Sequence, residues 1–234
     1  MEMLKIPLML LPGLLCDAAL WQHQTDTLGD LADIFVADLA HSEHAGEAAR
    51  AVLDRAPEEF ALAGLSMGGY VAFEILRQAP DRVRRLALIN TTARSDPPEK
   101  IKLRQELIDL ARTGQFKGVT PRLLPKLICP DRLNDGALTG QIMAMAERVG
   151  RDAFLRQQRL LMNRPDSRRD LSLVSCPTVV IGGRQDELTP LADSIEMAEK
   201  IRRAKLVIIE DCGHLSTMER PQAVSAILRY WLQD

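Results

Sequence analysis

Cysteine and histidine are both scarce in this 234-residue chain, which contains four of each. The spacing of the cysteines matches no common metal-ligand motif, so we expect no metal site. Cysteines scattered in this way are typical of free thiols in a reducing compartment, and they predict a cytoplasmic protein. The four are Cys16, Cys129, Cys176 and Cys212.

The chain also lacks a strong charge bias and a long apolar run. Its formal net charge of −2 gives no indication of nucleic-acid binding. The apolar stretch at residues 1–11 is too short to span a bilayer and has no charged leader region before it. We therefore expect a β-strand there and no membrane association. The 46% hydrophobic content can build a large core, and the length fits one domain with an insertion or at most two domains.

Short apolar runs alternate with helical patterns along most of the sequence. Several of these runs are nearly continuous, as expected for strands that are covered on both faces. The alternation predicts an α/β fold with a doubly wound parallel sheet. The predicted strands are residues 4–11, 34–38, 60–65, 86–90, 178–182 and 205–210, and the predicted helices are residues 17–28, 43–55, 66–79, 191–201 and 221–232.

A Gly-Leu-Ser-Met-Gly pentapeptide, residues 64–68, joins one predicted strand to the helix that follows it. This strand, sharp turn and helix context is that of a nucleophile elbow, in which a strained serine exposes its hydroxyl. The positions two before and two after Ser66 must be very small because strand and helix pack closely there. Gly64 and Gly68 meet this requirement, so Ser66 is the predicted nucleophile.

A serine hydroxyl needs a general base, and the base needs an acid that orients it. After an elbow serine of this kind, the acid comes first in the sequence and the histidine last. His214 is the only histidine after Ser66, and it follows the last predicted strand. Asp186 follows the strand at residues 178–182 and is the predicted acid, with Glu187 as the alternative.

These motifs resemble the α/β-hydrolase superfamily, and the resemblance extends over nearly the whole chain. It is closest to small bacterial esterase-like and lactonase-like members, and it implies a triad of Ser66, Asp186 and His214 with no cofactor. Because the first core strand begins near Met1, we expect a trimmed sheet of about six strands without the usual preceding hairpin. The matching segments are Leu11-Pro12-Gly13, residues 64–69, Gly183-Arg184-Gln185-Asp186 with Thr189-Pro190, and Gly213-His214 with Glu219-Arg220-Pro221.

Acyl transfer places negative charge on an oxygen atom, which two backbone N–H groups usually stabilise. One of these donors is expected at Met67, the residue after the nucleophile, where the helix dipole also favours an anion. The resemblance implies that the other donor is the N–H of Leu14. Many family members have His-Gly before this position, whereas this chain has Pro12-Gly13. The histidine that often supports the loop is therefore absent.

Residues 95–170 show no strand pattern, and they are too many for a simple connection. Helical patterns run at residues 99–113, 118–127, 135–149 and 151–163. The resemblance implies a helical lid inserted into a core domain of residues 1–94 and 171–234. Its apolar residues at helical spacing are expected mostly to form the lid core and in part to line an apolar acyl pocket, whose adaptable walls would come from Met143, Met145 and Met162. These residues at helical spacing are Leu103, Leu107, Leu110, Phe154, Leu155 and Met162. The segment has fifteen Lys and Arg residues against ten Asp and Glu. The excess of basic side chains belongs either to solvated helix faces or to a surface that attracts anionic substrates.

The sequence favours a cofactor-free serine hydrolase that cleaves carboxylic esters through an acyl-enzyme intermediate. Thioesterase and lactonase activities use the same groups and stay open. So do C–C bond or cyanohydrin cleavage, acyl transfer, and ligand binding without catalysis. A serine at the elbow excludes the usual dehalogenase and epoxide-hydrolase chemistry, which uses an aspartate there. The expected partner is a small-molecule ester, and the sequence predicts no oligomeric state.

Overall fold

The computed structural model describes residues 5–234 and contains one sheet of six strands, all of them parallel. The strands are β1 (Ile6–Leu11), β2 (Ala32–Val36), β3 (Phe60–Leu65), β4 (Val83–Ile89), β5 (Thr178–Gly183) and β6 (Lys205–Ile209). Their order is β2-β1-β3-β4-β5-β6, so the direction in which strands are added reverses between β1 and β3. Ligands of open α/β sheets bind beyond the carboxyl ends of the strands at such a reversal. The predicted doubly wound sheet is confirmed.

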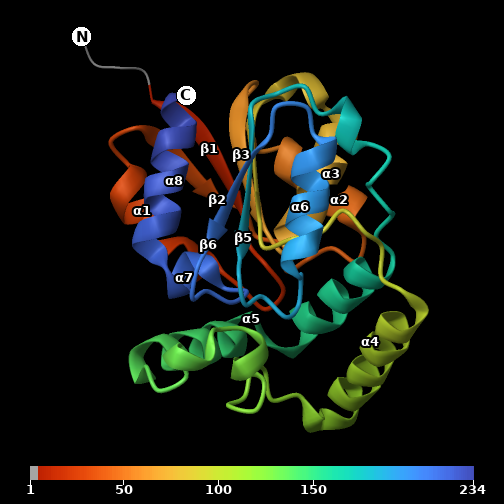
Figure 1. Cartoon of the computed structure of the whole chain (residues 1–234). Coiled ribbons are helices and arrows are strands. Elements are labelled where there is room, and N and C mark those ends of the chain that lie inside the picture. Colours follow the sequence, from red (N-terminus) through yellow and green to blue (C-terminus); the bar gives the residue numbers. More distant parts are fainter. Residues whose placement is uncertain (1–4) are drawn as a thin grey trace.

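Helices cover both faces of the sheet (Figure 1). One face carries α1 (Gln22–Leu28) and α8 (Pro221–Gln233), which contact each other. The other face carries α2 (Ala45–Leu53), α3 (Met67–Gln78) and α6 (Leu191–Lys200). Short helical turns complete the core: η1 (Ala18–Trp21), η2 (Pro80–Arg82), η6 (Leu171–Leu173) and α7 (Ser216–Glu219).

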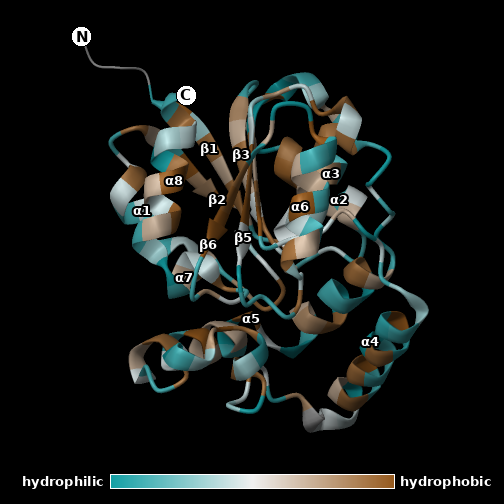
Figure 2. Cartoon of the chain, in the orientation of Figure 1, coloured by the Kyte–Doolittle hydropathy of each residue, from teal (hydrophilic) through white to brown (hydrophobic). Residues whose placement is uncertain are grey.

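Alternate side chains of the strands build two apolar clusters, one on each face. In β1, Leu8 and Leu10 belong to the cluster formed with α1 and α8, whereas Met9 and Leu11 belong to the cluster formed with α2, α3 and α6. Successive strand residues point to opposite faces, so a strand covered on both sides must be apolar throughout. Figure 2 shows the apolar residues concentrated on the strands between the two helical layers.

Residues 95–170, which we call the inserted segment, leave the sheet between β4 and β5. They contain α4 (Pro98–Leu110), a π-helical turn η3 (Ala111–Gln115), the 3-10 turns η4 (Leu124–Lys126) and η5 (Pro130–Arg132), and α5 (Gly136–Met162). The helix α5 is broken at Gly150, where φ is 78°, and the sequence predicts a helix boundary at this point. Both α4 and α5 lie below the sheet in Figure 1.

One buried carboxylate joins the two ends of the inserted segment. Asp96, just before α4, accepts hydrogen bonds from Arg104 on α4 and from Arg164 after α5, the latter at 2.8 Å. The Arg164 guanidinium also lies over the ring of Tyr70 on α3, 4.2 Å from its centroid. The ends of the segment are thus fixed to each other and to the core.

Some details of the sequence prediction are wrong. The pattern at residues 118–127 predicts a helix, but only the short turn η4 forms there. Pro121 and Pro125 lack an N–H and restrict the residues before them, which prevents a continuous helix. Leu103, Leu107 and Leu110 are not buried in the segment, because they are 52%, 37% and 49% exposed on α4. The short helix α7 was not predicted, and Leu4 of the first predicted strand lies outside the described residues.

Candidate active site

Ser66 forms the whole turn between β3, which ends at Leu65, and α3, which begins at Met67. Its φ is 54° and its ψ is −114°, a strained conformation for a residue with a side chain. The flanking glycines make the turn possible. A Cβ atom on Gly68 would lie 2.1 Å from the Leu11 carbonyl oxygen, and one on Gly64 would lie 2.5 Å from the Gly68 carbonyl oxygen. The turn leaves Ser66 half-buried at the carboxyl edge of the sheet.

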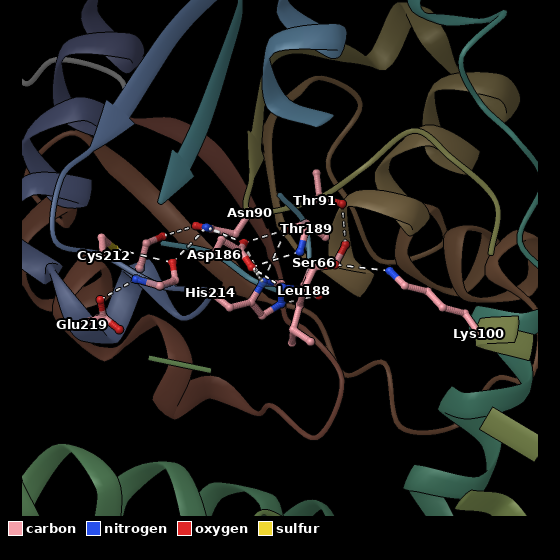
Figure 3. A network of polar contacts seen from close by, with 12 residues as sticks. Ser66, Asn90, Thr91, Lys100, Asp186, Leu188, Thr189, Cys212, His214 and Glu219 are labelled. Carbon is pink, nitrogen blue, oxygen red and sulfur yellow. Dashed lines mark hydrogen bonds and ion pairs between the residues drawn. The ribbon is translucent and has the colours of Figure 1, made fainter. Parts of the chain in front are cut away.

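His214 connects Ser66 to Asp186 (Figure 3). Its Nε2 lies 2.8 Å from Ser66 Oγ, and its Nδ1 lies 2.8 Å from Asp186 Oδ2 and 3.0 Å from Asp186 Oδ1. The three residues follow β3, β5 and β6, so the parallel sheet brings their loops to one edge. A hydroxyl, an imidazole and a carboxylate in this order can move a proton from the serine and stabilise the resulting imidazolium.

The Asp186 carboxylate is buried and has several hydrogen-bond donors. Thr189 donates from its hydroxyl to Oδ2 at 2.7 Å and from its backbone N–H to Oδ1 at 3.0 Å. Burial by itself raises the pKa of Asp186, but the charge and hydrogen bond of His214 and the hydrogen bonds of Thr189 outweigh it and hold the pKa at about 2. Asp186 is therefore ionised at neutral pH. The alternative acid, Glu187, is exposed, and the carboxylate that His214 contacts is that of Asp186.

A second buried carboxylate holds the loop that carries the histidine. Glu219 is fully buried and accepts the backbone N–H groups of Gly213 at 2.6 Å and Cys129 at 2.8 Å. Cys129 belongs to the inserted segment, and Leu127 of the same segment accepts the N–H of His214 through its carbonyl at 3.0 Å. The position of His214 therefore depends on contacts with the inserted segment.

Two backbone N–H groups near Ser66 make no hydrogen bond within the described part of the chain. Among residues 5–234, neither the N–H of Leu14 nor that of Met67 has a hydrogen-bond acceptor. Met67 begins α3, so its N–H lies at the positive end of a helix dipole. The loop with Leu14 passes close to the nucleophile, because a Cβ on Gly13 would lie 3.5 Å from Ser66 Cβ.

Comparison with known proteins assigns this chain to a family. A model of the alpha/beta hydrolase family matches residues 8–227. The chain belongs to the alpha/beta hydrolase family. The match covers most of the sheet and all three residues of the Ser66, His214 and Asp186 arrangement.

Relatives of this alpha/beta hydrolase are named as enzymes. A pimeloyl-[acyl-carrier protein] methyl ester esterase from Nitrosomonas europaea is 29% identical over 73% of this chain and 70% of that protein. A thermophilic esterase from Thermogutta terrifontis has a similar structure, with a TM-score of 0.87 and 29% sequence identity. The match covers 97% of this chain and 89% of the esterase chain. The enol-lactonase from Burkholderia xenovorans shares the fold, with a TM-score of 0.88 and 22% identity over 98% of this chain and 92% of that one. The protein is therefore a hydrolase-family enzyme.

The methionines predicted to line an acyl pocket occupy different environments in this alpha/beta hydrolase. Met145 is 1% exposed and lies in the apolar core formed with α1 and α8, against which the half-buried Met143 packs. Met162 is half-buried near the end of α5. Cys16 and Cys212 are buried, and burial raises the pKa of the Cys16 thiol to about 12.

Several residues that hold the site have no role that the sequence alone predicts. Asn90 donates to Asp186, Thr189 donates to the same carboxylate, and Glu219 fixes the histidine loop. Asn90 is a polar residue at the carboxyl end of a central strand, and this position in the sequence could have indicated a site residue. Gln157 on α5 has no such signal, because its partner is 142 residues away in the sequence.

The structure contains neither a metal-ligand cluster nor a transmembrane helix within residues 5–234. No group of three or more His, Cys, Asp and Glu side chains there is arranged to hold a metal ion. No helix in this range is both long and apolar enough to cross a bilayer.

Proposed function

We propose that this protein is a cofactor-free serine hydrolase that cleaves carboxylic esters through an acyl-enzyme intermediate. The observation that carries the proposal is the position of His214, whose two ring nitrogens each lie 2.8 Å from an oxygen of Ser66 or Asp186. In this arrangement Ser66 is the nucleophile, His214 the general base, and Asp186 the residue that orients the imidazole.

In the first half of the reaction, Ser66 Oγ attacks the acyl carbon while its proton passes to His214 Nε2. The carbonyl oxygen becomes an oxyanion, which accepts hydrogen bonds from the N–H groups of Leu14 and Met67. When the tetrahedral intermediate collapses, His214 gives the proton to the departing alcohol oxygen. The acyl group is then an ester of Ser66, and the ionised Asp186 has stabilised the transient imidazolium.

In the second half, His214 removes a proton from a water molecule that attacks the acyl-enzyme. The same N–H groups stabilise the second oxyanion, and the proton returns from His214 to Ser66 Oγ as the carboxylic acid leaves. Thioesters and lactones would follow the same steps, so the leaving group distinguishes these classes. The relative from Nitrosomonas europaea makes carboxylic methyl esters the first class to test.

The inserted segment, residues 95–170, is proposed to act as a lid domain on a core of residues 1–94 and 171–234. Its helices lie at the edge of the sheet that carries Ser66, and it contacts the loops of both Leu14 and His214. Of the three methionines predicted to line an acyl pocket, Met143 and Met162 are partly exposed. These two are proposed to contact the acyl group. The cytoplasmic location remains a prediction from the scattered cysteines.

The test uses a fluorophosphonate probe together with a panel of p-nitrophenyl esters, methyl esters, lactones and acyl thioesters. Ser66→Ala is expected to lose both labelling and hydrolysis, with a decrease in kcat on the order of 10⁶. Ser172→Ala, at an exposed serine of η6, is the matched control and is expected to behave as the native protein. Unchanged ester hydrolysis in Ser66→Ala would refute the mechanism, and a native protein inactive on the whole panel would refute ester hydrolysis.

A further inference from the structure

A glutamine of the inserted segment hydrogen-bonds to the loop that carries the proposed oxyanion donor Leu14. The side-chain oxygen of Gln157 on α5 accepts the backbone N–H of Leu15 at 3.0 Å. Its side-chain nitrogen donates to the Leu39 carbonyl, beyond β2, at 3.3 Å. Gln157 is 1% exposed, so no solvent replaces either contact, and both ends of its amide have a fixed orientation.

The contact with Gln157 restrains the peptide group that directly follows the Leu14 Cα. The N–H of this group is held by Gln157, and its carbonyl oxygen, that of Leu14, accepts the Cys16 thiol at 3.3 Å. The preceding peptide is held as well, because the Gly13 carbonyl accepts the Cys16 N–H at 3.2 Å. In a trans peptide the N–H points opposite to the C=O, so the Leu14 N–H is directed away from Cys16.

Leu15 also needs external support for its backbone conformation. Its φ is 57°, a region that glycine adopts readily and leucine does not. The Leu15 side chain is buried in a cluster with Ala111, Ala146 and Phe154, all of which belong to the inserted segment. The segment therefore holds Leu15 by its side chain and by its backbone, and this offsets the strain of the positive φ.

We propose that Gln157 is a positioning residue for the oxyanion hole, so that the inserted segment completes the catalytic loop as well as covering the site. The proposal rests on the proposed function, in which the Leu14 N–H meets the oxyanion. Many family members have a histidine before this glycine that supports the loop, whereas this chain has Pro12 before Gly13. In the proposal, Gln157 on α5 supports the loop instead.

The experiment compares Gln157→Leu with Gln158→Leu. Gln158 is the next residue on α5 and is equally buried, but its side-chain oxygen accepts from Arg104 at the root of the inserted segment. Both substitutions remove a buried amide and are expected to lower thermal stability similarly. Only Gln157→Leu is expected to lower kcat, by about 10- to 100-fold with little change in KM, since losing one oxyanion donor entirely costs about 10²- to 10³-fold.

Two further measurements separate positioning from a general structural effect. Gln157→Glu keeps an oxygen that can accept the Leu15 N–H, so it is expected to retain more of kcat than Gln157→Leu. A trifluoromethyl ketone, which forms a tetrahedral adduct with an active serine, is expected to bind Gln157→Leu more weakly in proportion to the loss of kcat/KM. Equal kcat values for Gln157→Leu and Gln158→Leu would overturn the proposal.

The positioning role can also be tested without turnover. In the native protein the Leu15 amide is expected to be protected from hydrogen exchange, measured by NMR, and to lose protection in Gln157→Leu but not in Gln158→Leu. Retained protection in Gln157→Leu would overturn the proposal even if the enzyme is active. If protection is lost as expected while the native protein hydrolyses no ester, the contact is established and the proposed function alone has failed.

Discussion

Asn90, at the carboxyl end of β4, donates its side-chain amide to Asp186 Oδ2 at 2.9 Å, the oxygen that lies nearest to His214 Nδ1. The same amide donates to the Gly213 carbonyl at 3.1 Å, and the Asn90 side-chain oxygen accepts from Ser216. One side chain thus joins the loop of the acid to the loop of the histidine.

Removal of this connection is expected to weaken both stability and turnover. Asn90 has a φ of 43°, so Asn90→Gly removes the side chain without adding backbone strain. We expect a decrease of about 1–3 kcal/mol in the free energy of unfolding and a decrease of roughly 10-fold in kcat, because a hydrogen bond to a charged, buried group is lost. Urea unfolding and steady-state kinetics measure the two effects. Asn163→Gly, at the exposed end of α5, is the control, and equal kcat values in both variants would contradict the prediction.

The assignment of Asp186 as the acid predicts a large difference between two neighbouring carboxylates. Asp186→Asn is expected to fold and to lose about 10⁴-fold in kcat, because an amide facing His214 favours the wrong tautomer. Glu187→Gln changes an exposed residue outside the network and is expected to keep nearly full activity. The measurement is kcat of both purified variants, after circular dichroism has shown that each has a native-like fold. The reverse pattern would make Glu187 the acid.

The low pKa of Asp186 makes a defined contribution to acid stability. A carboxyl whose pKa is lowered by folding, here from 3.8 to about 2, stabilises the fold above pH 4 and loses this contribution as the pH falls towards 2. The contribution is on the order of 2 kcal/mol. Urea unfolding of the native protein is therefore expected to show a steeper loss of stability between pH 4 and pH 2 than that of Asp186→Asn. Parallel curves for the two proteins would show that Asp186 does not gain this stabilisation on folding.

Much of the architecture could be predicted from the sequence because it depends on local patterns. The six strands are apolar runs, and the elbow at Ser66 needs glycines that are visible in the sequence. The helix boundary at Gly150 is marked by the glycine itself. The alternation of strands and helices predicts parallel strands, whose carboxyl ends meet at one edge, so the loops of Ser66 and His214 are expected to lie at the same edge.

The support of the site could not be predicted in the same way because it depends on contacts between distant residues. Gln157 and Leu15 meet only in the folded protein, where α5 contacts the loop that follows β1, and nothing near Gln157 in the sequence indicates a partner. Leu103, Leu107 and Leu110 illustrate the opposite error. Their helical spacing predicts an apolar face on α4, but spacing alone does not say whether another element covers that face.

Glu219 offers a test of how far the histidine loop depends on the inserted segment. Each of its carboxylate oxygens accepts one backbone N–H, from Gly213 or from Cys129. In Glu219→Gln, the amide nitrogen would face one of these N–H groups and leave it unpaired, at a cost of about 1–3 kcal/mol in unfolding free energy. We expect kcat to fall as the His214 loop loosens. Glu210→Gln, at an exposed carboxylate that pairs with Arg184, is the control, and similar values for both variants would contradict this role.

Several arginines of the inserted segment hold it to the core. Arg156 donates to the Ala40 carbonyl at 2.8 Å, and Arg159 forms an ion pair with Glu43. Both acceptors lie between β2 and α2, so these guanidinium groups join α5 to the core. Their charges are partly compensated there, which weakens the alternative that they attract anionic substrates.

The two roles of these arginines predict different salt dependences. With Arg156→Ala and Arg159→Ala combined, we expect a loss of roughly 1–2 kcal/mol in unfolding free energy, from one hydrogen bond to a carbonyl and one partly exposed ion pair. Arg151→Ala removes a pair with the adjacent Asp152 only and is the matched control. The measurement is kcat/KM for a carboxylate-bearing ester, divided by kcat/KM for a matched neutral ester, at several ionic strengths. We expect this ratio to change with ionic strength by the same amount in the native protein and in the double variant. The opposite result would be a kcat/KM that falls with salt for the anionic ester alone in the native protein, and falls less in the double variant. It would show that the arginines attract the anionic substrate, because salt screens such an attraction.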